Sequence, residues 1–329
     1  MKKICIVGAG AIGGFIGTRL AATGAVQVSA VARGATLAAL REHGWRMDTA
    51  SGRVHGPLHA AAEQAAELGP QDLVVIAVKG PALASVAQGL VPLLSPDTVV
   101  LPAMNGVPWW FCESVPGFAG EPLASMDPGG HIARALPFER VLGCVVHAGT
   151  ATSAPGLVVH RMGQGLIVGE PRGGSSPRAQ QVAALLAAAG FDATASENVR
   201  YDIWYKLWGN MTMNPVSAIT GATLDRLLAD RLVRDFCSAA MTEAVAIGAR
   251  IGCAITQSPE DRHAMTAKLG AFKTSMLQDV EAGRAIELDA LVAAVHEIGQ
   301  RLQLPTPNIA ALLGLARLFG RTHGLYPAA

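Results

Sequence analysis

A glycine-rich motif near the N-terminus constrains the fold more than any other feature of this sequence. Residues 8–13 read Gly-Ala-Gly-Ala-Ile-Gly and match the pattern G-x-G-x-x-G. The motif directly follows a β-rich run at residues 3–7 and opens a helical run at residues 15–23. The pattern alone is weak evidence, but in this context it is typical of a βαβ unit that binds a dinucleotide.

The three glycines of the motif have different physical roles in such a unit. Gly8 permits the tight turn, Gly10 lets the backbone approach a pyrophosphate, and Gly13 lets the helix pack closely on the strand. The helix N-terminus then offers free N–H groups and the positive end of its dipole to the phosphates. The residues predicted to bind the dinucleotide are Gly8, Ala9, Gly10, Ala11, Ile12 and Gly13. A glycine-rich turn without a ligand is the alternative.

The same N-terminal stretch has a second interpretation, a secretory signal, because Lys2 and Lys3 precede an apolar run. Its many glycines make a poor signal helix, and the dinucleotide motif explains the same residues better. No other apolar run is long enough to span a bilayer. We therefore expect a cytoplasmic protein that does not bind membranes.

The composition excludes several classes of protein. A chain of 329 residues is long for one core and indicates two domains. Half of the residues are hydrophobic and 16% are charged, which argues against disorder. The net charge of +1, without a run of Lys and Arg, argues against a nucleic-acid partner. The five scattered cysteines lack metal-ligand spacing, so we expect reduced thiols and no metal site.

Strand-like and helical segments alternate in the first half of the chain. Strands are expected at residues 26–32, 72–78 and 99–103, and the nearly continuous apolar run at 72–78 indicates burial on both faces. Further strands are expected at 141–146, 157–160, 166–168 and 191–195, with a helix at 177–189. From about residue 197 the pattern is helical. The sequence predicts an α/β protein, with a Rossmann-type doubly wound domain at 1–196 followed by an all-helical domain at 197–329.

The end of the second predicted strand indicates which dinucleotide is bound. NAD sites usually place Asp or Glu there to bind the ribose 2′-hydroxyl, but no acidic residue occurs between Gly8 and Glu42. Arg33 stands there instead and can pair with a 2′-phosphate. This favours NADPH over NADH, unless Arg33 is only a solvated cation. Lys79 and Asn105 follow two other strands at the same edge; each is either a cofactor contact or a surface residue.

A lysine in an apolar helix is the second chemical signal. Lys206 is the only charged residue from 203 to 219, and Asn210 and Asn214 follow it at spacings of four and eight. These three side chains form one polar stripe on the helix. A buried ammonium needs hydrogen-bond partners, and its lowered pKa would suit a proton donor. A lysine whose head reaches solvent is the alternative. Pro215 is expected to end or kink the helix.

Together these residues resemble the ketopantoate reductase (2-dehydropantoate 2-reductase) family over almost the whole chain. The resemblance rests on the glycine motif, Asn105-Gly106, the Lys206-x3-Asn210-x3-Asn214-Pro215 helix, and a final block. That block is Ser275-Met276-Leu277-Gln278-Asp279, followed by Arg284 and Glu287.

The resemblance implies a reaction and a role for each residue. NADPH would deliver hydride to the ketone carbon of ketopantoate, giving pantoate for pantothenate and coenzyme A synthesis. Lys206 would be the general acid and Glu287 would orient it. Asn210, Asn214 and Ser275 would bind the substrate, Asn105 would lie between nicotinamide and substrate in an interdomain cleft, and Lys79 would contact the cofactor.

The sequence also departs from the family pattern. Residues 109–138 form a longer insertion, interpreted as a lid, a substrate wall or a plain surface loop. Val292-Ala293 replaces the Asn-Gly pair common in the family. Two further hypotheses therefore stay open: a paralogous reductase of another 2-oxo acid or ketone, and a non-catalytic NADP(H)-binding sensor. The Ala/Leu/Met-rich helices can support a homodimer.

Overall fold

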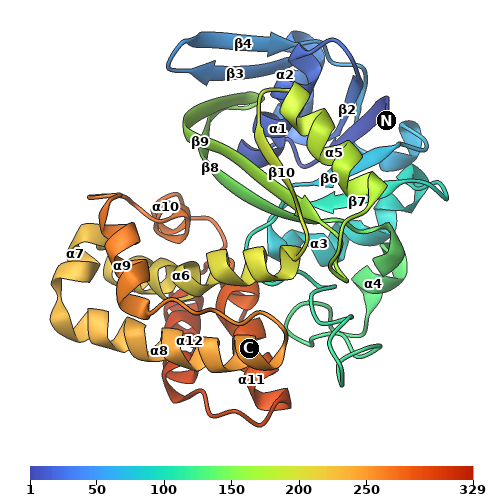
Figure 1. Cartoon of the computed structure of the whole chain (residues 1–329). Coiled ribbons are helices and arrows are strands. Elements are labelled where there is room, and N and C mark those ends of the chain that lie inside the picture. Colours follow the sequence, from blue (N-terminus) through green and yellow to red (C-terminus); the bar gives the residue numbers. More distant parts are fainter. Residues whose placement is uncertain (329) are drawn as a thin grey trace. The chain divides into compact units, whose positions relative to one another are not determined.

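The computed structural model describes residues 1–328, which form two compact units (Figure 1). The first unit consists of Met1–Met104 and Gly130–Arg200, and the second of Asn105–Gly129 and the chain from Tyr201 onward. The segment Asn105–Gly129, which the sequence places in the first domain, thus packs with the helical unit. The reason is its apolar content, since the buried Phe111 stacks on Trp204 at 5.9 Å between ring centroids.

A five-stranded parallel sheet forms the centre of the first unit, as the sequence predicts. Its strands are ordered β5-β2-β1-β6-β7. Their bounds are Lys3–Val7 (β1), Gln27–Val31 (β2), Ala61–Ala62 (β5), Leu73–Ile76 (β6) and Val99–Pro102 (β7). All residues of β6 and β7 are buried, because both faces of these strands are covered. The crossover helices are α1 (Ala11–Ala22), α2 (Gly34–His43) and α3 (Gly80–Val86).

A second sheet in the same unit has the order β10-β9-β3-β4, with β8 paired to β9. Its strands are Trp45–Thr49 (β3), Gly52–Gly56 (β4), Gly143–Ala154 (β8), Leu157–Gly169 (β9) and Asp192–Ser196 (β10). The β3–β4 hairpin was not predicted from the sequence. The two runs expected at 157–160 and 166–168 form one strand, because the intervening residues 161–165, although mostly polar or glycine, continue the ladder with β8.

The remaining elements of the first unit are short, apart from one helix. They are η1 (Ala65–Glu67), η2 (Ala87–Leu93), α4 (His131–Ala135), η3 (Phe138–Arg140) and the longer α5 (Pro177–Ala188). The long helix α6 (Val199–Thr220) leads from the first unit into the second.

The second unit is helical, which confirms the predicted fold class. After α6 follow α7 (Leu224–Ala229), α8 (Arg231–Arg250), α9 (Pro259–Ala267), α10 (Ser275–Glu281), the π-helix η4 (Asp289–Ala293), α11 (Ala294–Arg301) and α12 (Pro307–Thr322). Of the two expectations for Pro215, the end of α6 is wrong, since the helix continues to Thr220, while a kink there stays a prediction. Its continuation is stabilised by packing, because Val216 is buried with Leu224 and Leu312 in an apolar cluster.

The five cysteines are all buried. Within residues 1–328, no cluster of His, Cys, Asp and Glu side chains is arranged to hold a metal ion. The helices of the same residues are too short or too polar to cross a bilayer.

Candidate active site

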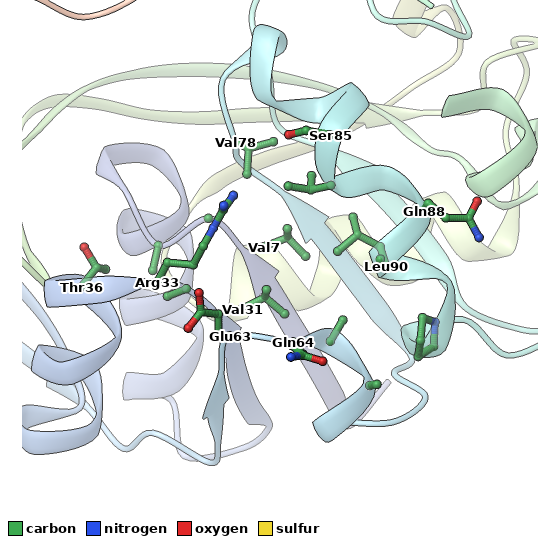
Figure 2. A pocket seen from close by; sticks show the side chains of 18 of the residues that line it. Val7, Val31, Arg33, Thr36, Glu63, Gln64, Val78, Ser85, Gln88 and Leu90 are labelled. Atoms are coloured by element: carbon green, nitrogen blue, oxygen red, sulfur yellow. The ribbon is translucent and has the colours of Figure 1, made fainter. Parts of the chain in front are cut away.

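The first unit contains a cavity of about 720 Å³ at the carboxyl edge of its parallel sheet (Figure 2). Four strand ends contribute to its lining: Gly8 follows β1, Arg33 follows β2, Glu63 follows β5 and Val78 follows β6. The wall continues along α3 and η2 with Ser85 to Pro92. Ligands of doubly wound sheets bind at this edge, and the volume is that of a small-molecule site.

The glycine motif has the geometry that a bound pyrophosphate requires. Gly8 has φ of +89°, and a Cβ on Gly13 would lie 2.0 Å from the carbonyl oxygen of Gly8. Gly10 lines the cavity, and a Cβ on it would meet no atom within 4 Å. The first turn of α1 carries no acidic residue, so no carboxylate of this helix end competes with an anion there. A dinucleotide phosphate therefore fits the open space beside Gly10.

Arg33 lies where the sequence predicts a phosphate contact. It is the N-cap residue of α2, is exposed, and lines the cavity. Figure 2 shows its side chain directed toward Val78. Lys79 directly follows Val78 and is the N-cap residue of α3, but it is not part of the cavity lining.

Sequence reasoning missed Glu63, a second charged residue in the cavity wall. It follows β5, which is only two residues long and pairs in parallel with β2. A two-residue strand has no readable alternation of polar and apolar residues, so nothing in the sequence indicates this position.

The predicted lysine site lies in the second unit. The Lys206 ammonium on α6 donates a hydrogen bond of 2.8 Å to Oδ1 of Asn105. Both side chains are partly buried. The expectation that this ammonium has a hydrogen-bond partner is therefore confirmed.

The remaining predicted substrate residues lie on α6 and at the start of α10. Nδ2 of the buried Asn214 donates to Oγ of Ser275 at 3.5 Å, a long hydrogen bond. Asn210 is partly buried one turn before Asn214. The structure thus brings Asn214 and Ser275 together, as it does Lys206 and Asn105. Glu287 is partly buried between the buried Ile286 and Leu288, and its contact with Lys206 stays a prediction.

The backbone beside Asn105 is fixed by the π-helix η4. The amide of Val107 donates to the carbonyl oxygen of Ala290 at 2.8 Å. Gly106 has φ of +81°, and a Cβ on it would lie 2.5 Å from the same oxygen. Only glycine fits this approach, which explains the Asn105-Gly106 pair. π-Helical turns occur frequently at functional sites.

A hydrogen bond from Tyr326 holds the first residue of this π-helix. The Tyr326 hydroxyl donates to Oδ1 of Asp289 at 2.5 Å. Burial raises the pKa of Asp289, and burial together with Asp289 raises the pKa of Tyr326 to about 12. The Tyr326–Asp289 pair was not predicted from the sequence, because 37 residues separate its members.

The segment that begins at Asn105 is anchored to α11. The Glu297 carboxylate accepts hydrogen bonds from the amides of Ala124 and Ser125, both at 2.8 Å, and from the Ser125 hydroxyl at 2.7 Å. Arg301 pairs with Glu297 and also donates to the carbonyl oxygens of Glu121 and Pro122. Residues 105–129 therefore pack as part of the second unit, and the interpretations of the 109–138 insertion as a lid, a substrate wall or a surface loop stay predictions.

Comparison with known proteins identifies the family of the chain. The family models for the ketopantoate reductase PanE/ApbA and for its C-terminal region match residues 4–173 and 198–319. A 2-dehydropantoate 2-reductase from Mesorhizobium japonicum is 42% identical, over 98% of this chain and 99% of the relative.

Solved structures give the same result. One from Ralstonia solanacearum MolK2, assigned as a ketopantoate reductase, is 55% identical with a TM-score of 0.94 and covers 99% of each chain. The 2-dehydropantoate 2-reductase from Methylococcus capsulatus is 28% identical with a TM-score of 0.83 over 97% of each chain. The chain belongs to the ketopantoate reductase (PanE/ApbA) family of oxidoreductases.

Proposed function

We propose that this protein reduces 2-dehydropantoate (ketopantoate) to pantoate with NADPH, as a cytoplasmic enzyme of pantothenate and coenzyme A synthesis. The 42% identical relative that carries this activity in its name supports the substrate. The observation that carries the proposal is the hydrogen bond of Lys206 to Asn105, in a chain whose other unit has a glycine-lined cavity. A sensor that only binds a dinucleotide has no need of this ammonium.

The residues proposed to hold the dinucleotide are Gly8 to Gly13, Arg33, Lys79 and Asn105. The open space at Gly10 and the α1 N-terminus, which has no side-chain cap, suit its phosphates. When bound, NADPH supplies the hydride for the ketone carbon.

Lys206 is proposed as the general acid. Its ammonium carries the proton at Nζ and donates it to the ketone oxygen as negative charge develops there. Asn105 holds Nζ in position through its amide oxygen, and Glu287 is proposed to orient the same ammonium. Because Asn105 is neutral, the hydrogen bond that it accepts does not itself neutralise the positive charge of Lys206.

Asn210, Asn214 and Ser275 are proposed to bind the polar groups of the substrate. Amide and hydroxyl groups can hydrogen-bond a carboxylate and a hydroxyl without adding charge. The Asn214–Ser275 distance of 3.5 Å leaves both groups capable of a shorter bond to a ligand.

The experiment that tests this function follows NADPH consumption with a panel of ketones. The panel contains ketopantoate, the analogue that lacks only its hydroxyl, pyruvate, and a simple ketone without a carboxylate. We expect the highest kcat/KM for ketopantoate. The kcat/KM for the analogue should be at least about 100-fold lower, because the missing hydroxyl leaves polar groups of the site unpaired. Equal rates with all 2-oxo acids would indicate a different substrate, and no NADPH consumption with any ketone would contradict a reductase.

A further inference from the structure

Two residues of opposite charge, Arg33 and Glu63, follow neighbouring strands of the parallel sheet and line the proposed dinucleotide cavity. Strands β2 and β5 are parallel neighbours, with Val31 in register with Ala62. The amide of Ala32 donates to the carbonyl oxygen of Ala62 at 3.0 Å, so Arg33 and Glu63 follow at adjacent positions. Both line the cavity, and Figure 2 shows their side chains on the same side of it.

Both side chains are available to a ligand. Arg33 and Glu63 are exposed, and they are the charged members of the cavity lining among the described residues. Within residues 1–328, neither side chain forms a hydrogen bond or an ion pair, with the other or with any third residue. Neither charge is therefore neutralised by the protein.

The position of β5 in the sheet indicates which part of a dinucleotide Glu63 meets. The glycine loop after β1 suits the pyrophosphate, and the end of β2 suits the adenosine ribose. Strand β5 lies beyond β2 on the side away from β1. A ribose held at the end of β2 would therefore have Glu63 on its outer side, within the same cavity wall, where its 2′ substituent, a phosphate in NADPH and a hydroxyl in NADH, would meet the carboxylate.

A carboxylate at this place acts oppositely on the two cofactors. It repels a phosphate that carries nearly two negative charges. It accepts a hydrogen bond from a hydroxyl, and bonds to charged acceptors are stronger than those between neutral groups. Arg33 has the reverse preference, because its guanidinium pairs with phosphate.

We propose that Glu63 determines cofactor selectivity by opposing Arg33, so that the protein binds NADH as well as NADPH. The carboxylate binds the ribose 2′-hydroxyl of NADH and weakens the binding of the 2′-phosphate of NADPH. This inference rests on the proposed dinucleotide-binding function of the cavity and extends it to a residue outside the glycine motif.

The test measures the affinities of ADP-ribose and 2′-phospho-ADP-ribose by calorimetry, at a salt concentration of about 0.15 M. These probes differ only at the 2′ position. For Glu63→Gln we expect about fivefold or more tighter binding of the phosphorylated probe and about threefold to tenfold weaker binding of ADP-ribose. Glu63→Ala is expected to shift the ratio of the two affinities in the same direction.

The matched control is Asp97→Asn, which removes the same charge at an exposed residue near the amino end of β7, the opposite edge of the sheet. It is expected to leave both affinities within about twofold, because salt screens charges beyond about 8 Å.

The proposal is overturned if the ratio of the affinities for 2′-phospho-ADP-ribose and ADP-ribose is unchanged in both Glu63 variants. A shift of this ratio in favour of ADP-ribose overturns it as well. Since the probes lack nicotinamide, their binding is independent of ketone turnover. A selectivity shift in a protein that reduces no ketone supports this inference while the proposed function fails.

Discussion

Lys206 and Asn105, which are 101 residues apart, are joined by a hydrogen bond of 2.8 Å between an ammonium and an amide oxygen. The position of Asn105 depends on its neighbours, because Val107 donates to the carbonyl oxygen of Ala290 and Gly106 approaches that oxygen too closely for a Cβ. The orientation of the proposed proton donor therefore depends on a backbone contact to a π-helical turn.

Replacing Gly106 by Ala is expected to displace Asn105 and lower kcat by about tenfold to 100-fold. The added Cβ would lie 2.5 Å from the Ala290 oxygen, so the backbone has to shift. The matched control is Gly117→Ala, where φ is +83° but a Cβ meets nothing within 4 Å. Gly117→Ala introduces the backbone strain of a positive φ but no steric clash. It should lose about 1 kcal/mol or more of stability without a change in kcat. Equal kcat values in the two variants would contradict the role of the Ala290 contact.

Alanine is expected to lower dinucleotide affinity at one glycine of the motif and protein stability at another. Gly10→Ala has room in the fold and should keep the free energy of unfolding within about 0.5 kcal/mol, while dinucleotide affinity falls at least about tenfold. Gly13→Ala brings a Cβ to 2.0 Å from a carbonyl oxygen and should destabilise the first unit by about 3 kcal/mol. Denaturant unfolding and probe titration measure both effects. Normal dinucleotide binding by Gly10→Ala would show that the phosphates lie elsewhere.

The sequence predicted the elements whose side chains follow a regular pattern. The buried strands β1, β6 and β7, the glycine turn and the Lys206 helix were read from local patterns alone. The β3–β4 hairpin, the Glu63 position and the Tyr326–Asp289 pair were missed. Each depends on contacts between distant segments or on strands too short to show a period. The end of α6 expected at Pro215 was wrong, because tertiary packing of the following turn outweighs the backbone N–H that proline lacks.

Replacing Arg33 by Ala should weaken NADPH binding more than NADH binding. The guanidinium can form charge-assisted hydrogen bonds with the 2′-phosphate, so we expect about tenfold or more loss for NADPH and less than about threefold for NADH. Titration of both cofactors measures the two losses. The same loss for both would refute the assignment of Arg33 to the 2′-phosphate.

Glu297 is expected to make the stability of the second unit sensitive to acid. Burial raises the pKa of its carboxyl, but hydrogen bonds from Ser125, Ala124 and Arg301 outweigh burial and hold that pKa below its usual value. A lowered pKa in the folded state means that the carboxylate stabilises the fold above about pH 4.3. This stabilisation disappears as the pH falls through the lower pKa of the folded protein.

Urea unfolding of Glu297→Gln measures this contribution. The variant should be about 1–3 kcal/mol less stable than the parent near pH 7, and the difference should shrink toward pH 3. The control Glu281→Gln removes an exposed ion pair with Lys273 and should change stability by less than about 1 kcal/mol at pH 7. A Glu297→Gln difference that does not depend on pH would contradict the account of this anchor.

The replacement of Lys206 by Ala tests the central claim most directly, with single-turnover hydride transfer from NADPH to ketopantoate as the measurement. Loss of the proton donor should slow this step by about 10²-fold to 10⁴-fold. Binding of 2′-phospho-ADP-ribose should be unchanged, because its proposed cavity is lined by the first unit. The exposed Lys268→Ala is the control and should react at the parent rate. Hydride transfer by Lys206→Ala at the parent rate would contradict the account.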